Sequence, residues 1–145
     1  NVLDVLRSTV DDRWESLARV VDLHADADWG DVGREGSPLW HLWHTADCFR
    51  HHASKIIGED RVDGEAWQAE LARPDATTAQ ELADILRADI ERFATWFESQ
   101  SASRVSRPVQ HGVEMSVQDM LNLMIRHVMW HVTRAHGLLV DQVSG

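Results

Sequence analysis

Apolar residues recur every three or four positions in four stretches of the chain, which is the spacing of an amphipathic helix. These stretches span residues 2–24, 38–57, 78–99 and 116–140. No stretch shows the strict alternation of apolar and polar residues that is typical of a half-buried strand. The pattern therefore predicts four helices. The apolar stripe of the first holds Val2, Leu3, Leu6, Val10, Trp14, Leu17, Val20 and Val21, and that of the third holds Leu82, Ile85, Leu86, Ile90, Phe93, Trp96 and Phe97.

The ends of these helices carry their own signals. Ser37 precedes Pro38, so an N-cap residue is followed by a proline at the first helical position. Gly58 follows the second stretch and is a typical C-terminal stop. Thr78 and Ser116 each precede an acidic residue by three positions, which is the spacing of a capping box.

The segments between the helices are of unequal length. Residues 26–36 predict a loop, and residues 59–75 and 101–115 predict two long connections. A short helix at 66–71 fits the first connection, and a short hairpin fits the second. Four helices of about 20 residues favour an all-α fold. We expect a single-domain four-helix bundle of up-down type with two long connections, covering residues 1–145.

The composition narrows the class of partner. Fourteen basic and 24 acidic residues give a net charge of −10, and such a surface repels nucleic acids and anionic membranes. No uncharged stretch of 18 residues and no signal peptide is visible, so we expect a cytoplasmic protein without a membrane span. The single cysteine, Cys48, excludes an intramolecular disulfide, which fits a reducing compartment.

Two histidines in the fourth predicted helix are the clearest sign of chemistry. His127 and His131 are four residues apart, so their side chains point only about 40° from each other. They lie among apolar residues, where an imidazole is costly to bury without a partner. Both nitrogens can reach one metal ion, which predicts a metal site completed from another helix. The Glu of the HExxH zinc-protease motif is absent, since Val128 occupies its place.

The second predicted helix offers several further donors. His44, Cys48 and His51 fall within about 40° of one another, and His41 and His52 form a neighbouring stripe. His44 is the strongest candidate because apolar residues surround it early in the helix. Cys48 is the reserve ligand, although a buried apolar role is the simpler one for it.

Other residues can support such a site. Asp47 is one turn from the candidate ligand of the second helix, where it can orient that imidazole or a water molecule. Trp43 and Trp130 each adjoin a proposed ligand and can wall a pocket. Arg126 or Arg134 can recognise an anionic group of a small-molecule substrate.

Simpler structural roles account for many remaining polar residues. The acidic residues of the first and third helices most simply form solvated faces. His136 lies about 180° around the helix from His127 and should face elsewhere. Single helical histidines are more often exposed or hydrogen-bonded than ligands, and this applies to His24, His41, His51, His52, His111 and His136.

Two motifs make the chain resemble the DinB-like (DinB/YfiT) metalloenzyme family of four-helix bundles. They are Ser37-Pro-Leu-Trp-His-Leu-Trp-His-Thr-Ala-Asp47 and Arg126-His-Val-Met-Trp-His-Val-Thr-Arg-Ala-His-Gly137. The resemblance implies a divalent metal (zinc, nickel or iron) held by His44, His127 and His131. It also implies a homodimer and, in members of known activity, a transferase or isomerase that uses a low-molecular-weight thiol such as mycothiol or bacillithiol.

Two registers of the second motif are open. Many relatives place the last histidine directly before an Arg-Gly-Gln-like turn, and in that register Ala135 would stand in place of a ligand. The other register keeps the pair four residues apart, with both members on the apolar face.

Three functions are compatible with these residues. A metal-dependent thiol S-transferase or isomerase is our first hypothesis, with a metal-dependent hydrolase beside it. The second is a metal-binding or small-ligand-binding stress-response protein without turnover. The third is a helical interaction protein whose histidines only pack.

Overall fold

The computed structural model describes residues 1–58 and 73–144, and it is mainly helical. The short helix expected at 66–71 lies outside the described residues. The all-α fold class is confirmed, apart from one small hairpin. In chain order the elements are α1 (Val2–Ser8), α2 (Leu17–Leu23), α3 (Pro38–Ile57), α5 (Ala79–Glu98), α6 (Ala102–Val105), β1 (Val109–His111), β2 (Val113–Met115) and α7 (Val117–Ser144).

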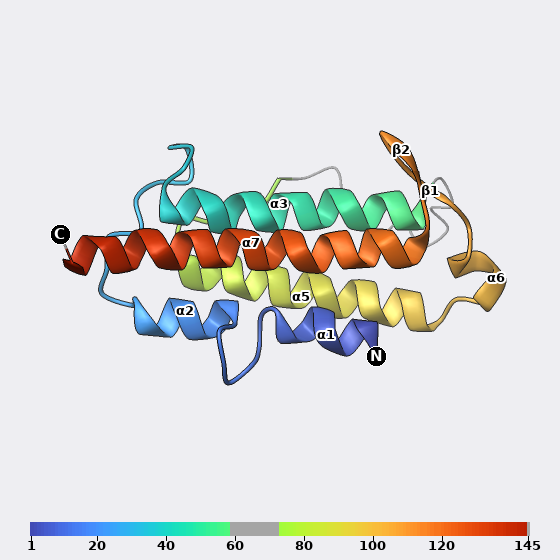
Figure 1. The fold of residues 1–145 in the computed structure, drawn as a ribbon, viewed down its shortest axis with the longest axis horizontal. Coiled ribbons are helices and arrows are strands. Elements are labelled where there is room, and N and C mark those ends of the chain that lie inside the picture. The colour runs from blue at the N-terminus through green and yellow to red at the C-terminus, as the bar shows by residue number, and fades with distance from the viewer. Residues whose placement is uncertain (59–72, 145) are drawn as a thin grey trace.

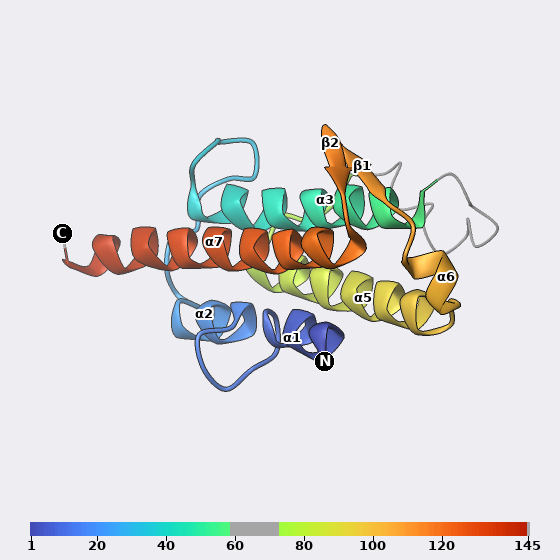
Figure 2. The ribbon, with the colours of Figure 1, turned by 45° about the vertical axis from the view of Figure 1, so that its right-hand side comes forward.

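The long helices pack side by side around one core (Figures 1 and 2). Helix α3 contacts both α5 and α7, and the α1–α2 pair contacts the same two helices from the opposite side. The α1–α2 pair therefore takes the position of the fourth helix in a bundle. Helices α3 and α5 run in the same direction, while α1, α2 and α7 run in the opposite one (Figure 1). A strict up-down order would make α3 and α5 antiparallel, so the direction of the chain does not simply alternate.

The prediction of one continuous helix over residues 2–24 is wrong. The chain leaves the helix after α1 and re-enters it at α2, and Trp14, expected inside a helix, is 71% exposed between them. Small polar side chains explain the break, because they bond to the backbone in place of helical partners. Thr9 donates to the Leu6 carbonyl, and Asp12 accepts from the Trp14 amide. Ser16 then caps α2, where its side chain accepts from the Arg19 amide.

The predicted ends of the second helix are confirmed. The Ser37 side chain accepts from the Trp40 amide, Pro38 opens α3, and Gly58 follows its last residue with φ of 68°. This positive φ is one that glycine adopts without strain. The N-cap predicted at Ser116 accepts from the Asp119 amide. Helix α7 continues beyond the predicted end at residue 140.

The hairpin expected between residues 101 and 115 is present, and a short helix, α6, precedes it. Val109 pairs with Met115 and His111 with Val113 in antiparallel register. Gly112 lies at the turn with φ of 77°. Strand β1 packs against α3, which places His111 beside the histidines near the end of that helix.

The core lies where α3, α5 and α7 meet. Its largest fully buried side chains include Phe49, Phe93, Met120 and Met124. Buried alanines on all three helices let the backbones approach closely, and they are Ala46, Ala53, Ala83, Ala94 and Ala135.

One acidic residue of the third predicted helix departs from the solvated role expected for it. Asp89 is 4% exposed, and its Oδ2 lies 2.6 Å from Nε of Arg50. A buried carboxylate requires such a partner. This ion pair joins α5 to α3 inside the bundle.

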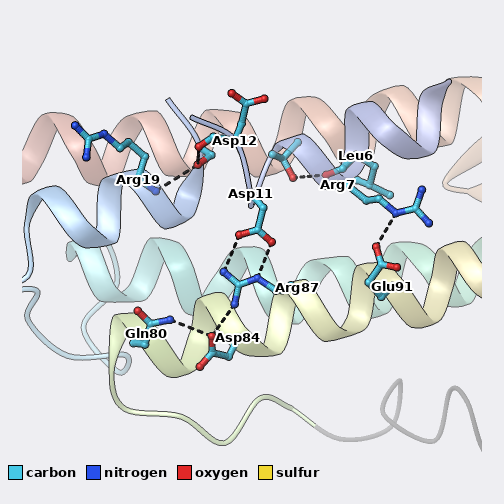
Figure 3. Close-up of polar contacts among 11 residues, drawn as sticks. Leu6, Arg7, Asp11, Asp12, Arg19, Gln80, Asp84, Arg87 and Glu91 are labelled. Atoms are coloured by element: carbon cyan, nitrogen blue, oxygen red, sulfur yellow. Dashed lines mark hydrogen bonds and ion pairs between the residues drawn. The ribbon is translucent and has the colours of Figure 1, made fainter. Parts of the chain in front are cut away.

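Exposed ion pairs join the start of the chain to α5 (Figure 3). Arg87 donates to both carboxylate oxygens of Asp11 and to Asp84. Arg7 donates to Glu91 and to Glu98. None of the helices within the described ranges combines the length and apolar character needed to cross a bilayer.

Candidate metal centre

Three histidines from two helices converge at the α3–α7 interface. His44 comes from α3, and His127 and His131 come from successive turns of α7. One ligand atom from each lies within 4.8 Å of the others, and among the described residues this is the group that could hold a metal. The two α7 imidazoles face each other, with 3.1 Å between their Nε2 atoms. The residues that the sequence predicted as ligands are therefore brought together.

Burial keeps these imidazoles in the form that binds a metal. Desolvation lowers the pKa of all three, and for His131 it acts together with the nearby His127, His44 and His41 to lower the pKa to about 3. A histidine must be neutral to donate a lone pair to a cation. At neutral pH the group therefore presents uncharged nitrogen donors.

The spacing of these nitrogens suits a small divalent ion. Imidazole nitrogens bind zinc at about 2.0–2.1 Å, so tetrahedral donors stand about 3.3 Å apart. The separation of 3.1 Å between the two α7 nitrogens is close to this value. Zinc, nickel and iron all accept imidazole ligands. The donor set and its spacing thus fit the expected divalent cation.

Cys48 lies beside this group and is not part of it. Its Sγ is 3.5 Å from Nε2 of His44, one turn earlier on α3. Burial first, and then the Asp47 carboxylate, raises the pKa of the Cys48 thiol to about 11. The thiol is therefore protonated at neutral pH. Within the described residues, three protein donors meet at the site.

Asp47 acts on the site through its charge. Its Oδ2 pairs with Arg73 at 3.2 Å. The carboxylates of Asp47 and Glu35 oppose the desolvation that lowers the pKa of His44. The orienting hydrogen bond to His44 predicted for Asp47 is not among the contacts of the described residues.

Sequence reasoning missed two residues that contact the candidate ligands directly. The Trp40 ring stacks on His44, with 4.6 Å between centroids and 11° between planes. Nδ1 of His41 lies 2.8 Å from Nδ1 of His131, and both side chains are buried. Their spacing along α3 could have identified them, because residues three and four positions before His44 share its side of the helix.

A second set of histidines continues from the site toward the hairpin. The ring of His52 is buried and makes edge contacts with His127 and with His111 of β1, at 5.3 and 5.2 Å between centroids. Desolvation lowers the pKa of His52 to about 3. His51, which the sequence grouped with His44, is exposed instead.

The residues predicted to wall a pocket are divided between two places. Trp130 and Arg126 line a groove of about 500 Å³ on α7, together with Met129, Thr133 and Arg134. The Trp130 ring also packs edge-on against His131, at 4.9 Å between centroids. Trp43 lies elsewhere, where it donates to the Pro74 carbonyl beneath Arg73.

The last histidine of the second motif lies against the C-cap residue of α2 and not with the three candidate ligands. Nδ1 of His136 lies 2.9 Å from Nε2 of His24, the residue that follows α2. Ala135 is fully buried and carries no donor. The geometry therefore favours the register in which His127 and His131 form the pair.

Comparison with known proteins agrees with this architecture. The family model of the DinB superfamily matches residues 9–134, which cover the first histidine motif and the second as far as Arg134, including His127 and His131. No curated protein and no solved structure matches the chain. Because the family match covers most of the chain, the protein belongs to the DinB superfamily.

Proposed function

We propose that this protein is a metal-dependent enzyme that uses His44, His127 and His131 to hold a divalent cation. Its reaction would be of the thiol S-transferase or isomerase class, with a low-molecular-weight thiol as cosubstrate. The observation that carries the proposal is the convergence of three nitrogen donors within 4.8 Å. Catalytic sites typically use three protein ligands and leave a position for water or substrate, whereas structural zinc sites use four.

The charge of the donor set supports chemistry at this site. Three neutral imidazoles carry no negative charge, so a divalent ion bound by them would keep its full positive charge. A cation held there supplies Lewis acidity, which lowers the pKa of a thiol or a water molecule close to it. Trp40, stacked on His44, holds that ring in place and keeps solvent from one of its faces.

The groove on α7 is the proposed binding surface for the organic substrate. Trp130 lines this groove, and its ring also packs edge-on against His131, so one side chain connects the groove to a proposed ligand. Arg126 and Arg134 are exposed at the groove, and neither makes an ion pair within the described residues. Two free guanidinium groups suit a substrate or thiol that carries a carboxylate.

A binding protein without turnover is the second candidate, and Cys48 is the observation that favours it. Its Sγ is close enough to His44 for a change of side-chain rotamer to bring it toward the same ion. A fourth protein ligand would close the coordination shell and leave a structural or storage site. Metal coordination measured by X-ray absorption separates the two, since a sulfur ligand supports the binding protein and a shell of nitrogen and oxygen supports the enzyme.

The test of the proposed activity is a thiol-consumption assay with a matched pair of variants. Purified metal-loaded protein is given an electrophile and each low-molecular-weight thiol in turn, beside His127→Ala and His136→Ala. We expect His127→Ala to lose activity and bound metal, and His136→Ala, on the same helix but outside the group, to keep both. Equal rates for the wild type and His127→Ala would remove the metal-catalysis proposal. Hydrolysis of an ester substrate by the wild type, lost in His127→Ala, would instead support the hydrolase.

Assembly and compartment complete the proposal. Family resemblance supports a homodimer, and the lone cysteine supports a reducing, cytoplasmic compartment. Light scattering of the purified protein measures the first directly: a mass of 16.5 kDa is that of one chain, and twice this mass is that of the dimer.

A further inference from the structure

Two histidines meet through their Nδ1 atoms beside the proposed metal ligands. His41 lies one turn before His44 on α3, and its Nδ1 is 2.8 Å from Nδ1 of His131. The two side chains are 5% and 6% exposed. The ring of Trp40 packs edge-on against both, at 5.1 and 6.2 Å between centroids. The contact is therefore enclosed by protein.

The chemistry of imidazole leaves two arrangements for this contact. A neutral ring carries one N–H and one lone pair. Two facing nitrogens at hydrogen-bond distance must supply one of each, because two N–H groups would collide and two lone pairs would repel. Either His131 donates to His41, or His41 donates to His131.

When a cation is present, the other ring nitrogen of His131, Nε2, decides between these two arrangements. This nitrogen faces Nε2 of His127 at 3.1 Å, where the cation is proposed to bind. A cation there takes the lone pair of Nε2, so the proton of His131 must stand on Nδ1. In the reverse arrangement the proton stands on Nε2, and this nitrogen has no lone pair to offer.

We propose that His41 is a positioning residue, which accepts a hydrogen bond from Nδ1 of His131 and so presents Nε2 of His131 to the cation. The inference rests on the metal site of the proposed function. Metal-binding histidines generally donate their second N–H to an outer partner, whose loss costs about 10- to 100-fold in metal affinity. Here that partner is a neutral imidazole, so it adds no negative charge to the site.

Zinc affinity of three variants tests this role. His41→Leu removes the acceptor and puts an apolar side chain of similar volume in its place. His41→Asn instead places an acceptor oxygen near the position of Nδ1. His24→Leu is the matched control, because it breaks another contact between a histidine ring and α7, the one to His136. Affinity is measured by competition with a chromogenic chelator.

We expect His41→Leu to bind zinc about 10- to 100-fold more weakly than the wild type. His41→Asn should recover most of this loss, and His24→Leu should bind as the wild type does. Wild-type affinity in His41→Leu would overturn the proposal, because His41 would then only pack. A loss in His41→Asn as large as that in His131→Ala would also overturn it, because His41 would then be a ligand.

Nitrogen-15 NMR of the histidine rings gives a second reading that needs no variant. In the zinc-loaded wild type we expect the proton of His131 on Nδ1 and an unprotonated Nδ1 on His41. A proton on Nδ1 of His41, or zinc bound through a His41 nitrogen, contradicts the proposal even where a variant fails to fold.

The outcomes also separate this inference from the proposed function. If the wild type takes up none of zinc, nickel and iron, both fail. If it takes up zinc and His41→Leu binds equally well, only the inference fails. If zinc binds and His41→Leu weakens it while no thiol is consumed, the inference stands and the enzymatic function fails.

Discussion

Two interfaces of the bundle contain different kinds of polar contact. Between the start of the chain and α5, arginines face carboxylates: Arg87 binds Asp11 and Asp84, and Arg7 binds Glu91 (Figure 3). Arg7 also binds Glu98. Between α3 and α7, the polar groups are imidazoles that face one another. Burial lowers the pKa of His41, His44, His127 and His131, and the described residues bring no carboxylate into hydrogen-bond contact with these rings.

The difference distinguishes a structural polar interface from a binding one. Groups in the first interface satisfy each other at the surface, where such pairs contribute little to stability. In the second, three neutral imidazoles, each with one lone pair, bring their nitrogens within 4.8 Å of one another. A cation would complete this second set, and it has no role in the first.

The largest effect should follow from removing His44, the proposed ligand on α3. In the wild type, zinc at a thousandfold excess over its Kd should stabilise the fold by about 4 kcal/mol. His44→Ala should lose most of this stabilisation, while Arg87→Ala in the other interface should keep it. Thermal unfolding with and without zinc measures both, alongside elemental analysis of the purified proteins. An undiminished zinc effect in His44→Ala would show that the cation binds elsewhere.

The Arg50–Asp89 pair sharpens the comparison. Like the exposed interface it joins an arginine to a carboxylate, but like the histidine interface it lies inside the bundle. Asp89→Ala should destabilise the protein by about 3 kcal/mol, since it leaves a part-buried guanidinium without this carboxylate. Urea unfolding of the metal-free protein measures the loss. Asp84→Ala, which removes an exposed carboxylate from the same helix, is the control, and equal effects of the two changes would contradict the argument.

Acid should weaken the metal-free protein through its buried histidines. Burial, followed by the neighbouring rings, lowers the pKa of His131 and of His52 from 6.5 to about 3 in the folded state. Between these values the unfolded chain binds more protons, so stability falls as pH drops below about 6.5 and continues to fall toward about 3. Melting temperatures from pH 7 to pH 5 should decline, and less steeply in His131→Leu. A constant melting temperature over this range would argue against buried neutral imidazoles.

The smallest effect should come from the exposed interface. Arg87→Ala breaks all three of the hydrogen bonds that this guanidinium makes to Asp11 and Asp84, yet we expect a loss of less than about 1 kcal/mol. Salt should reduce this difference further, because exposed charges are screened. Urea unfolding at low and high ionic strength measures it. A loss of several kcal/mol would place this interface among the structural determinants of the fold.

Sequence reasoning was most accurate where the signal is local. The ends of α3 follow from Ser37, Pro38 and Gly58, because capping depends on side chains within three or four residues. The pairing of His127 with His131 follows from the pitch of a single helix. The break between α1 and α2 was missed, because the apolar spacing continues through residues 9–16 while their hydroxyl and carboxylate groups bond to the backbone instead.

The sequence by itself determined the helical class, the main helix ends and the pair of nitrogens on α7, since each depends on neighbours along one helix. Only the tertiary structure decided which residues of α3 meet that pair, that His41 contacts His131, and that α3 and α5 run in the same direction. These features depend on how one helix is rotated and shifted against another. That choice is made by packing across the whole core, and no short stretch of sequence specifies it.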